Sequence, residues 1–526
     1  MNTRQGRRRQ RLHVCCWKWN KQLLALCLLL AVCLTGCGEK KQASREQEAL
    51  TLSIHMHYWG EVAFHDDWPV FKKAEELTGI RLKGDVSLTA ADSSQVFNIM
   101  LESGKLSDIV HLEKRNANKY GAEGVFLPLN DLIDQYAPNI KAFFEEDPRA
   151  KQHMTSSDGN IYYISFISEG ETGKGYFIRK DWLDRLGLSV PEDFDAYYDA
   201  MLQFKNKDPN GNGEADEIPL FFRGGGEEGS ISSLLGVRGG IVFENGKATY
   251  PKATSEYRRC LQTLQKWYSQ GLIDPQLYTR GFNARDELLK SDRGGATHDW
   301  FASTASYNDI LKGSIPGFEM IAIKPPMERG RTPVEPDPRV TYSNIGWSVS
   351  KYNQHPIETI QYFDFWFSEE GRRLMNYGIE GEQYDMVDGK PRFKPEILNA
   401  NKPVLEILND IGAQTEIGFR QDYDYEKQWM NQYALDGIRM YVDNGYIMKN
   451  DFNYNFTLEE QKIIEEREGY INDYIGRMSR RFIMGELSVD AEFDNYLNQL
   501  RAMGVQKVLD AYQQAYDRQI KQGGNS

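Results

Sequence analysis

The segment LTLSIHM at residues 50–56 begins the pattern that decides the fold of this chain. It alternates in a period of two, as a strand does, and residues 80–86 (IRLKGDV) and 107–112 (SDIVHL) are predicted as two further strands. Helices are predicted between them at residues 68–78 and 94–103, with Gly79 as a typical helix-ending residue. Strand, helix, strand, helix, strand within this length predicts parallel βαβ units and therefore an α/β protein.

The length and charge of the chain limit its architecture and its partners. The globular part runs from residue 50 to about residue 519, which is more than one core usually holds, so we expect two lobes. Residues from 404 onward are largely helical in pattern. The formal net charge is −13, and it becomes −20 without the first 36 residues, which hold seven basic residues and no acidic one. Such an acidic protein is not expected to bind nucleic acid.

The N-terminus has the features of a secretion signal. Basic residues precede an apolar run from Leu23 to Leu34 that is too short to span a bilayer. The run ends in Leu34-Thr35-Gly36-Cys37, which resembles the lipobox of bacterial lipoproteins. That resemblance implies a signal peptide at residues 1–36, lipidation of Cys37 and a flexible tether at residues 37–49. An uncleaved signal anchor is the alternative.

Cys260 is the one cysteine that remains beyond residue 37, so the body of the protein has no internal disulfide. Its neighbours Tyr257, Leu261 and Leu264 recur at helical spacing. We therefore expect Cys260 to be a small core residue and not a nucleophile.

Several segments in a fixed order carry a resemblance to a known family. They are residues 77–80 (LTGI), 101–110 (LESGKLSDIV), 126–133 (FLPLNDLI), 158–164 (DGNIYYI) and 176–188 (YFIRKDWLDRLGL). Together they resemble family 1 extracellular solute-binding proteins, and most of all the large oligosaccharide-binding lipoproteins that are similar to alginate-oligosaccharide-binding proteins. The resemblance implies a two-lobed α/β fold of the type 2 periplasmic-binding-protein kind, with a helix-rich C-terminal portion.

The same resemblance implies a function and a location. The chain is expected to capture an oligosaccharide as a monomer and to deliver it to the permease of an ABC importer. Its place is the outer face of the cell membrane, held by the lipid anchor, most naturally in a Gram-positive bacterium.

The expected lobes are each made of two stretches of chain. Residues 50–165 and 296–350 are assigned to the N-terminal lobe, and residues 166–295 and 351–526 to the C-terminal lobe. The crossings between lobes are expected near residues 164–168, 293–297 and 348–352.

A loop in the second of these lobes has the composition of a calcium site. Oxygen-bearing residues recur through residues 207–219 (KDPNGNGEADEIP), with Gly213 where a sharp turn is needed. The loop differs from an EF-hand because position twelve is Pro219 and not a bidentate Glu. Similar loops hold calcium in alginate-binding relatives, which implies a structural Ca²⁺ ion. The candidate ligands are Asp208, Asn210, Asn212, Asp216 and Glu217 through their side chains, and Glu214 through its carbonyl. A solvated Asn-Gly turn is the alternative.

The ligand site is expected where exposed aromatic rings stand beside polar groups, since sugars offer apolar C–H faces and hydroxyls. In open α/β sheets such residues follow the strands. The candidates are His57, Trp59, Asp299, Trp300, Trp347, Glu382 and Tyr384, and residues 420–429 could form a rim. Four arginines could meet an acidic sugar, namely Arg179, Arg223, Arg238 and Arg420.

The sequence holds no Gly-x-Ser-x-Gly elbow, P-loop, His-Glu-x-x-His or Cys-x-x-Cys motif, so we do not expect an enzyme. Two alternatives stay open. One is a surface carbohydrate-active enzyme, a hydrolase or a lyase. The other is a receptor for peptides or for signalling.

Overall fold

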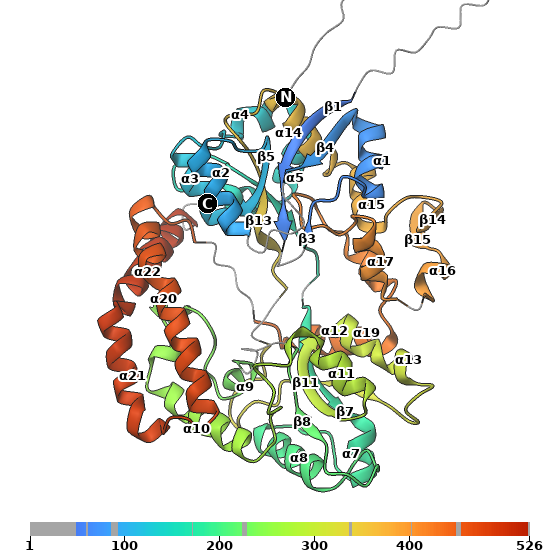
Figure 1. Ribbon diagram of the computed structural model, residues 1–526, viewed down its shortest axis with the longest axis vertical. Coiled ribbons are helices and arrows are strands. Elements are labelled where there is room, and N and C mark those ends of the chain that lie inside the picture. Colours follow the sequence, from blue (N-terminus) through green and yellow to red (C-terminus); the bar gives the residue numbers. More distant parts are fainter. Residues whose placement is uncertain are drawn as a thin grey trace, which may run out of the picture. The chain divides into compact units, whose positions relative to one another are not determined.

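The computed structural model describes residues 49–58, 62–85, 93–170, 172–223, 229–335, 339–400, 402–448 and 454–523 (Figure 1). Its first elements confirm the predicted alternation. They are β1 (Leu50–His55), α1 (Pro69–Thr78), β4 (Ile80–Gly84), α2 (Ser93–Ser103) and β5 (Ile109–Glu113). The short strands β2 (His57–Tyr58) and β3 (Val62–Ala63) form a separate antiparallel pair. Gly79 ends α1 in the left-handed conformation, at φ 72°, as predicted.

The first sheet has the strand order β4-β1-β5-β13-β6. The strand β1 runs parallel to both β4 and β5, so the predicted βαβ units are present. The other two strands are β13 (Tyr342–Val349) and β6 (Ile164–Ile167), and β13 runs antiparallel to its neighbours β5 and β6. One strand from far along the chain therefore completes this sheet.

The core of the first sheet also includes a later part of the chain. Buried residues between Leu52 and Ile167 pack with buried residues between Trp347 and Tyr425. The later group comes from β13, α14 (Pro356–Phe365), α15 (Glu369–Tyr377), α17 (Val404–Asp410) and the segment after it. Residues 351–425 were expected in the other lobe, and their apolar side chains instead complete this core.

The second sheet has the order β12-β7-β11-β8. Its strands are β7 (Lys174–Arg179), β8 (Ile218–Leu220), β11 (Gly294–Trp300) and β12 (Met320–Ile323). The strand β7 pairs antiparallel with both β11 and β12, and β11 runs parallel to β8. Residues 296–323 therefore belong with the second sheet. The expected boundary is wrong here, since it assigned them to the N-terminal lobe together with the first sheet. The difference arises because strand pairing is non-local, so spacing along the chain does not reveal the partner of β11.

Helices surround the second sheet and dominate the end of the chain, as expected. They include α10 (Glu256–Ser269), α19 (Gln432–Asp443), α20 (Leu458–Ile483), α21 (Val489–Met503) and α22 (Val505–Gly523). The last three pack on one another and are drawn in red in Figure 1. A capping box between Thr457 and Glu460 begins α20. Within the described residues, no helix combines the length and the apolar character that crossing a bilayer requires.

Cys260 on α10 is fully buried in the core that α10 shares with α20, which confirms the prediction from its helical spacing. Burial raises the pKa of its thiol to about 12. A thiol with that pKa stays protonated and unreactive at neutral pH.

Candidate functional site: a cavity lined from both sheets

Three segments run from the part of the chain that holds the first sheet to the part that holds the second. Residues 168–173 join β6 to β7, and residues 324–341 join β12 to β13. The third segment includes α18 (Tyr423–Lys427) and leads to α19. Only the first of these lies near an expected crossing.

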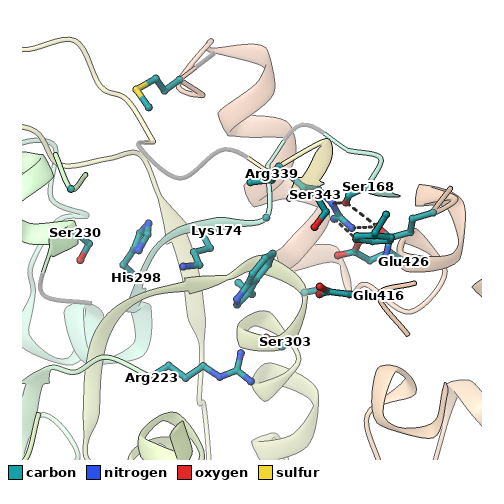
Figure 2. A pocket seen from close by; sticks show the side chains of 18 of the residues that line it. Ser168, Lys174, Arg223, Ser230, His298, Ser303, Arg339, Ser343, Glu416 and Glu426 are labelled. Atoms are coloured by element: carbon teal, nitrogen blue, oxygen red, sulfur yellow. Dashed lines mark hydrogen bonds and ion pairs between the residues drawn. The ribbon is translucent and has the colours of Figure 1, made fainter. Parts of the chain in front are cut away.

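A cavity of about 1200 Å³ lies beside these segments and is lined by residues from both parts of the chain. Figure 2 shows Lys174, Arg223, His298 and Ser303, which belong with the second sheet. It also shows Ser168, Arg339, Ser343, Glu416 and Glu426, which come from the crossing segments and the first part. The wall therefore combines charged groups, hydroxyls and aromatic rings.

Trp300 presents an aromatic face to this cavity and is 43% exposed. It ends β11 and pairs across the sheet with Lys174, whose ammonium lies 5.7 Å from the centre of the indole ring. The ring packs against Gly173, where a β-carbon would lie 2.4 Å from the indole Cζ3. The absence of a side chain at Gly173 thus allows Trp300 to lie flat while its other side remains open.

Asp299 lies behind Trp300 and is only 2% exposed. Its Oδ2 accepts a hydrogen bond of 2.8 Å from Arg285, and its Oδ1 accepts one of 2.7 Å from the Trp300 backbone N–H. A second guanidinium, that of Arg223, lies 3.9 Å from Oδ1. Asp299 therefore supports the cavity wall from behind and does not line it.

His298 reaches the same cavity, two residues before Trp300 on the same face of β11. Its Nε2 lies 2.9 Å from Oε2 of Glu335, and Glu335 is fully buried. The His298 ring also packs on Tyr176, with 4.6 Å between ring centres. These contacts fix the orientation of the imidazole.

Arg339 joins all three crossing segments. It donates to Ser168 Oγ at 2.7 Å, to Gln421 Oε1 at 2.6 Å and to Glu426 Oε2 at 2.6 Å. The side chains of Arg339 and Glu426 are 9% and 10% exposed, so this is a buried ion pair. Its guanidinium also covers the ring of Tyr423 at 5.2 Å. The geometry of the crossings is thus held by one cluster of charge-assisted hydrogen bonds.

The structure places some of the predicted ligand-facing residues at the cavity and others in the core. Trp300 lines the cavity, and Asp299 lies directly behind the wall. Trp347 is fully buried between Tyr362 and Phe363, so the expectation that it faces a ligand is wrong. The reason is that β13 is an interior strand of the first sheet and its apolar face is covered by α14.

Tyr384 and Glu382 lie away from the cavity wall. Tyr384 is 3% exposed in the hairpin of β14 (Tyr384–Val387) and β15 (Lys390–Phe393), where its ring packs on Tyr377. That contact makes the expectation for Tyr384 wrong. Glu382 is exposed in the turn before β14 and is not among the described residues that line the cavity.

Two other candidates fall outside what the structure describes. The backbone of His57 lies in β2, but its side chain is not described, and Trp59 lies outside the described residues. Cys37 and the tether at residues 37–48 also lie outside them.

Of the four arginines proposed to meet an acidic sugar, two line the large cavity and two lie elsewhere. Arg223 and Arg238 line the cavity. Arg179 is fully buried between Asp181 and Asp292, at 2.7 Å from each. Arg420 lines a smaller cavity of about 620 Å³, where Glu146 and Glu169 accept its hydrogen bonds.

The loop at residues 207–219 folds around its acidic side chains. The Asp208 carboxylate accepts from the backbone N–H groups of Gly211, Asn212 and Gly213 at 2.9–3.1 Å. Asn210 and Asn212 both donate to Asp216 Oδ1, at 3.2 and 3.1 Å. Gly213 has a φ of 83°, which only glycine adopts readily. Asp208 and Asp216 are therefore each surrounded by donors from the loop itself, Asp208 by backbone N–H groups and Asp216 by the two Asn side chains.

Glu217 gives the strongest sign that this loop fits a cation. It is fully buried, and neither of its carboxylate oxygens has a hydrogen-bond partner. Desolvation raises the pKa of Glu217, and the nearby charges of Asp208 and Asp216 raise it further. Across the described ranges, no group of three or more His, Cys, Asp or Glu side chains is placed to hold a metal ion, so Asp208, Asp216 and Glu217 do not form such a group by themselves. Oxygen donors of the Asn residues and of the backbone are thus needed to complete a calcium shell.

Comparison with known proteins assigns the chain to a family. The model of the bacterial extracellular solute-binding protein family matches residues 68–373. The chain belongs to this family.

Three similar proteins extend the match over nearly the whole chain. The structure of the alginate-binding protein AlgQ2 without calcium ion is 39% identical, covers 90% of this chain and 98% of its own, and has a TM-score of 0.84. The fructooligosaccharide ABC transporter substrate-binding protein FusA of Streptococcus pneumoniae is 26% identical over 95% of this chain and 98% of its own. The polygalacturonan/rhamnogalacturonan-binding protein YtcQ of Bacillus subtilis is 24% identical over 95% of this chain and 99% of its own.

These findings confirm the family resemblance and the two-lobed α/β fold expected from the sequence. This solute-binding protein shares its family with binding proteins and not with enzymes. The match begins at Trp68 and ends in α15, so it includes strands of both sheets.

Sequence patterns missed several residues of this wall. Lys174 begins β7, and only the antiparallel pairing with β11 brings it to the edge where Trp300 ends its strand. Arg339 comes from the second crossing segment, which no local pattern indicated. The rim suggested for residues 420–429 is represented at the cavity by Gln421, Tyr425, Glu426 and Trp429.

Proposed function

We propose that this solute-binding protein captures an oligosaccharide in the large cavity and delivers it to the permease of an ABC importer. The cavity is the observation that carries the proposal, since its volume of about 1200 Å³ exceeds the roughly 300–1,000 Å³ of sites for drug-sized ligands. An exposed indole face beside hydroxyls and charged groups suits a chain of sugar rings, because it offers both stacking and hydrogen bonds.

The relatives support a carbohydrate as the ligand class. AlgQ2 is named for alginate, FusA for fructooligosaccharide and YtcQ for polygalacturonan and rhamnogalacturonan. These ligands are all chains of sugar units, although they differ in linkage and in charge. Carbohydrate is therefore the ligand class proposed for this chain.

Capture is proposed to occur by closure of two lobes about the three crossing segments. The Arg339 cluster lies where these segments meet, so it is placed to hold their relative positions while the flanking backbone turns. The closed form is the one expected to dock on the permease as a monomer.

Anchoring at the outer face of the membrane is the second part of the proposal. Family membership supports an extracellular location, and the Leu34-Thr35-Gly36-Cys37 motif supports a lipid on Cys37. The polar residues 38–48 then form a tether that keeps the binding module near its permease. A Gram-positive surface, which lacks an outer membrane, fits this arrangement best.

A structural calcium ion in the loop at residues 208–217 is the third part. It is supported by the buried Glu217 carboxylate that lacks a hydrogen-bond partner. Two similar structures are described as AlgQ2 without calcium ion and as a FusA EF-hand mutant. Asp208, Asn210, Asn212, Asp216 and Glu217 are the proposed side-chain ligands, with the carbonyl of Glu214.

A binding screen tests the function. The purified full-length chain is mixed with neutral oligosaccharides, acidic oligosaccharides and peptides, and its thermal midpoint is measured. A ligand at about 100 times its Kd should add roughly 2.7 kcal/mol of stability. Oligosaccharides are expected to raise the midpoint and to be recovered intact after overnight incubation. Stabilisation by peptides alone, or cleavage of the sugar, would contradict the proposal.

A further inference from the structure

Trp300 stands where the chain turns from the strand β11 into the short helix α12 (Phe301–Ala305). Its ring, 43% exposed, is the surface on which a sugar is proposed to stack. We infer that Gly173 and Asp299 are positioning residues, which hold this ring in its ligand-binding orientation before a ligand arrives. The inference rests on the proposed function and adds to it the residues that set the geometry of the stacking surface.

Gly173 leaves free the space that the back of the indole occupies. A β-carbon at this position would lie 2.4 Å from Cζ3, 2.8 Å from Cε3 and 3.4 Å from Cη2 of Trp300. These three atoms belong to the six-membered ring, so that ring covers the α-carbon of Gly173. The φ angle of Gly173 lies outside the left-handed region, so its backbone would also accept alanine. Contact with the indole is therefore what calls for glycine here.

The next ring along the chain, that of Phe301, anchors the backbone behind Trp300. The Phe301 N–H donates to the carbonyl of Gly173 at 2.8 Å. Its ring fills the space beside Gly175, where a β-carbon would lie 2.4 Å from Cζ. Phe301 is 1% exposed, and its ring meets that of Tyr441 edge-on with 5.1 Å between ring centres. The segment around Gly173 thus contacts both consecutive rings and the backbone between them.

Asp299 fixes the turn from strand to helix. One of its oxygens accepts from the Trp300 backbone N–H at 2.7 Å, and the other accepts from Arg285 at 2.8 Å. Arg285 also donates to Ser303 Oγ at 2.7 Å and to Thr304 Oγ1 at 3.1 Å, both in α12. Asp299 and Arg285 are buried, so these charge-assisted hydrogen bonds are shielded from water. One ion pair therefore ties the end of the strand to the first turn of the helix.

The position of the ring matters because one sugar has to satisfy stacking and hydrogen bonding together. Trp300, His298 and Ser303 line the same cavity. Binding groups work together when they are held to within about 0.5 Å of their productive geometry. A β-carbon at position 173 would have to push the nearest indole atom from 2.4 Å to at least 3.4 Å, the start of ordinary contact. A shift of that size separates the stacking face from the polar groups of the wall.

Titration calorimetry on the full-length chain tests this inference. The probes are trimannuronate, trigalacturonate and 1-kestose, and the one that binds the parent most tightly is titrated into each variant. Gly173→Ala and Asp299→Asn should each weaken its binding by about 3- to 10-fold, because the stacking face is displaced. Gly313→Ala is the matched control, since Gly313 is exposed and an added β-carbon there meets no atom within 4 Å. It should leave the Kd unchanged.

A double-mutant cycle distinguishes positioning of the ring from general structural damage. In the Trp300→Ala background the ring is absent, so Gly173→Ala and Asp299→Asn should each change the Kd by less than about twofold. Losses as large in this background as in the parent would mean that the two residues do not act through Trp300. That result would overturn the inference.

A measurement without ligand follows the ring directly. The chain is labelled with 5-fluorotryptophan, and the fluorine resonance of Trp300 is assigned by its loss in Trp300→Phe. This resonance should shift or broaden in Gly173→Ala and in Asp299→Asn, and it should stay in place in Gly313→Ala. A Trp300 resonance that is unchanged in both positioning variants would also overturn the inference.

The outcomes separate this inference from the proposed function. If a probe binds the parent and binds Gly173→Ala and Asp299→Asn equally tightly, the inference fails while the proposed function stands. If the parent binds no oligosaccharide, among these probes or in the wider screen, the proposed function fails and the inference fails with it.

Discussion

Removing the proposed calcium ion from the loop at residues 208–217 should lower the thermal stability of the full-length chain, because the buried Glu217 carboxylate then has no partner. Glu217 is fully buried, and neither carboxylate oxygen accepts a hydrogen bond. With a calcium ion bound, those oxygens become ligands and the burial of their charge is compensated. Without the ion, the same charge opposes folding.

The size of the effect follows from binding linkage. Calcium at about 100 times its Kd stabilises the folded state by roughly 2.7 kcal/mol. A unit of 150–250 residues shifts its midpoint by about 2–4 °C per kcal/mol. The lobe that carries the loop should therefore melt about 5–10 °C lower in a chelator than in excess calcium. Differential scanning calorimetry measures this midpoint, and titration calorimetry of the stripped protein measures the heat of binding.

Glu217→Gln should act in opposite directions in the two conditions. In a chelator it removes a buried charge, so the variant should be more stable than the parent by about 1–3 kcal/mol. In calcium it lacks a ligand and should lose most of the calcium-dependent rise. Glu214→Gln is the matched control in the same loop, since the exposed Glu214 is expected to contribute only its backbone carbonyl. Equal midpoints with and without calcium, and no heat on titration, would refute the reasoning.

Three further predictions concern the cavity, the crossing segments and a buried lysine. Trp300→Ala removes the exposed stacking face, so oligosaccharide affinity measured by calorimetry should fall at least about 10-fold, and an unchanged Kd would contradict a role in binding. Arg339→Met leaves the carboxylate of Glu426 buried without its partner and should cost about 3–5 kcal/mol in urea unfolding. The double variant Arg339→Met with Glu426→Gln should recover part of that loss, and additive losses would argue against the pairing. Burial lowers the pKa of Lys114 to about 7. Between pH 7 and about 10.5 the unfolded chain therefore binds one more proton than the folded chain, so folding stability rises with pH by up to about 1.4 kcal/mol per pH unit. Lys114→Met should lose this rise in a urea series run at pH 7.5–9.5, and parallel pH profiles of variant and parent would contradict it.

Much of the fold could be predicted from local patterns. Period-two and helical spacing indicate β1, α1, β4, α2 and β5. Each element buries one apolar face, and the residues that form this face recur at short, regular spacing in the sequence. The helix end at Gly79 and the calcium-type loop are equally local, since both depend on the conformations that individual residues allow. Family membership likewise follows from motifs in a fixed order.

The cavity could be predicted only in part. Trp300 could be predicted from the sequence because it follows a strand beside polar residues. Gln421, Tyr425, Glu426 and Trp429 could be predicted because they belong to an aromatic and polar run. Trp347 showed the same kind of local pattern, yet it is buried between Tyr362 and Phe363. A ring beside a strand can face either a core or a ligand, and the neighbouring sheet and helices decide which.

The amino-acid sequence by itself indicated the α/β class, an export signal that ends at Cys37, the acidic charge and the oxygen-rich loop, because these depend on composition or on residues close together in the chain. The tertiary structure alone decided which strands share a sheet, which part of the chain completes each core, and how Lys174, Arg223, Arg339 and Trp300 come to line one cavity. These residues lie far apart in sequence, and only non-local strand pairing and the three crossing segments bring them together. The cavity wall is therefore a property of the folded chain and not of its composition.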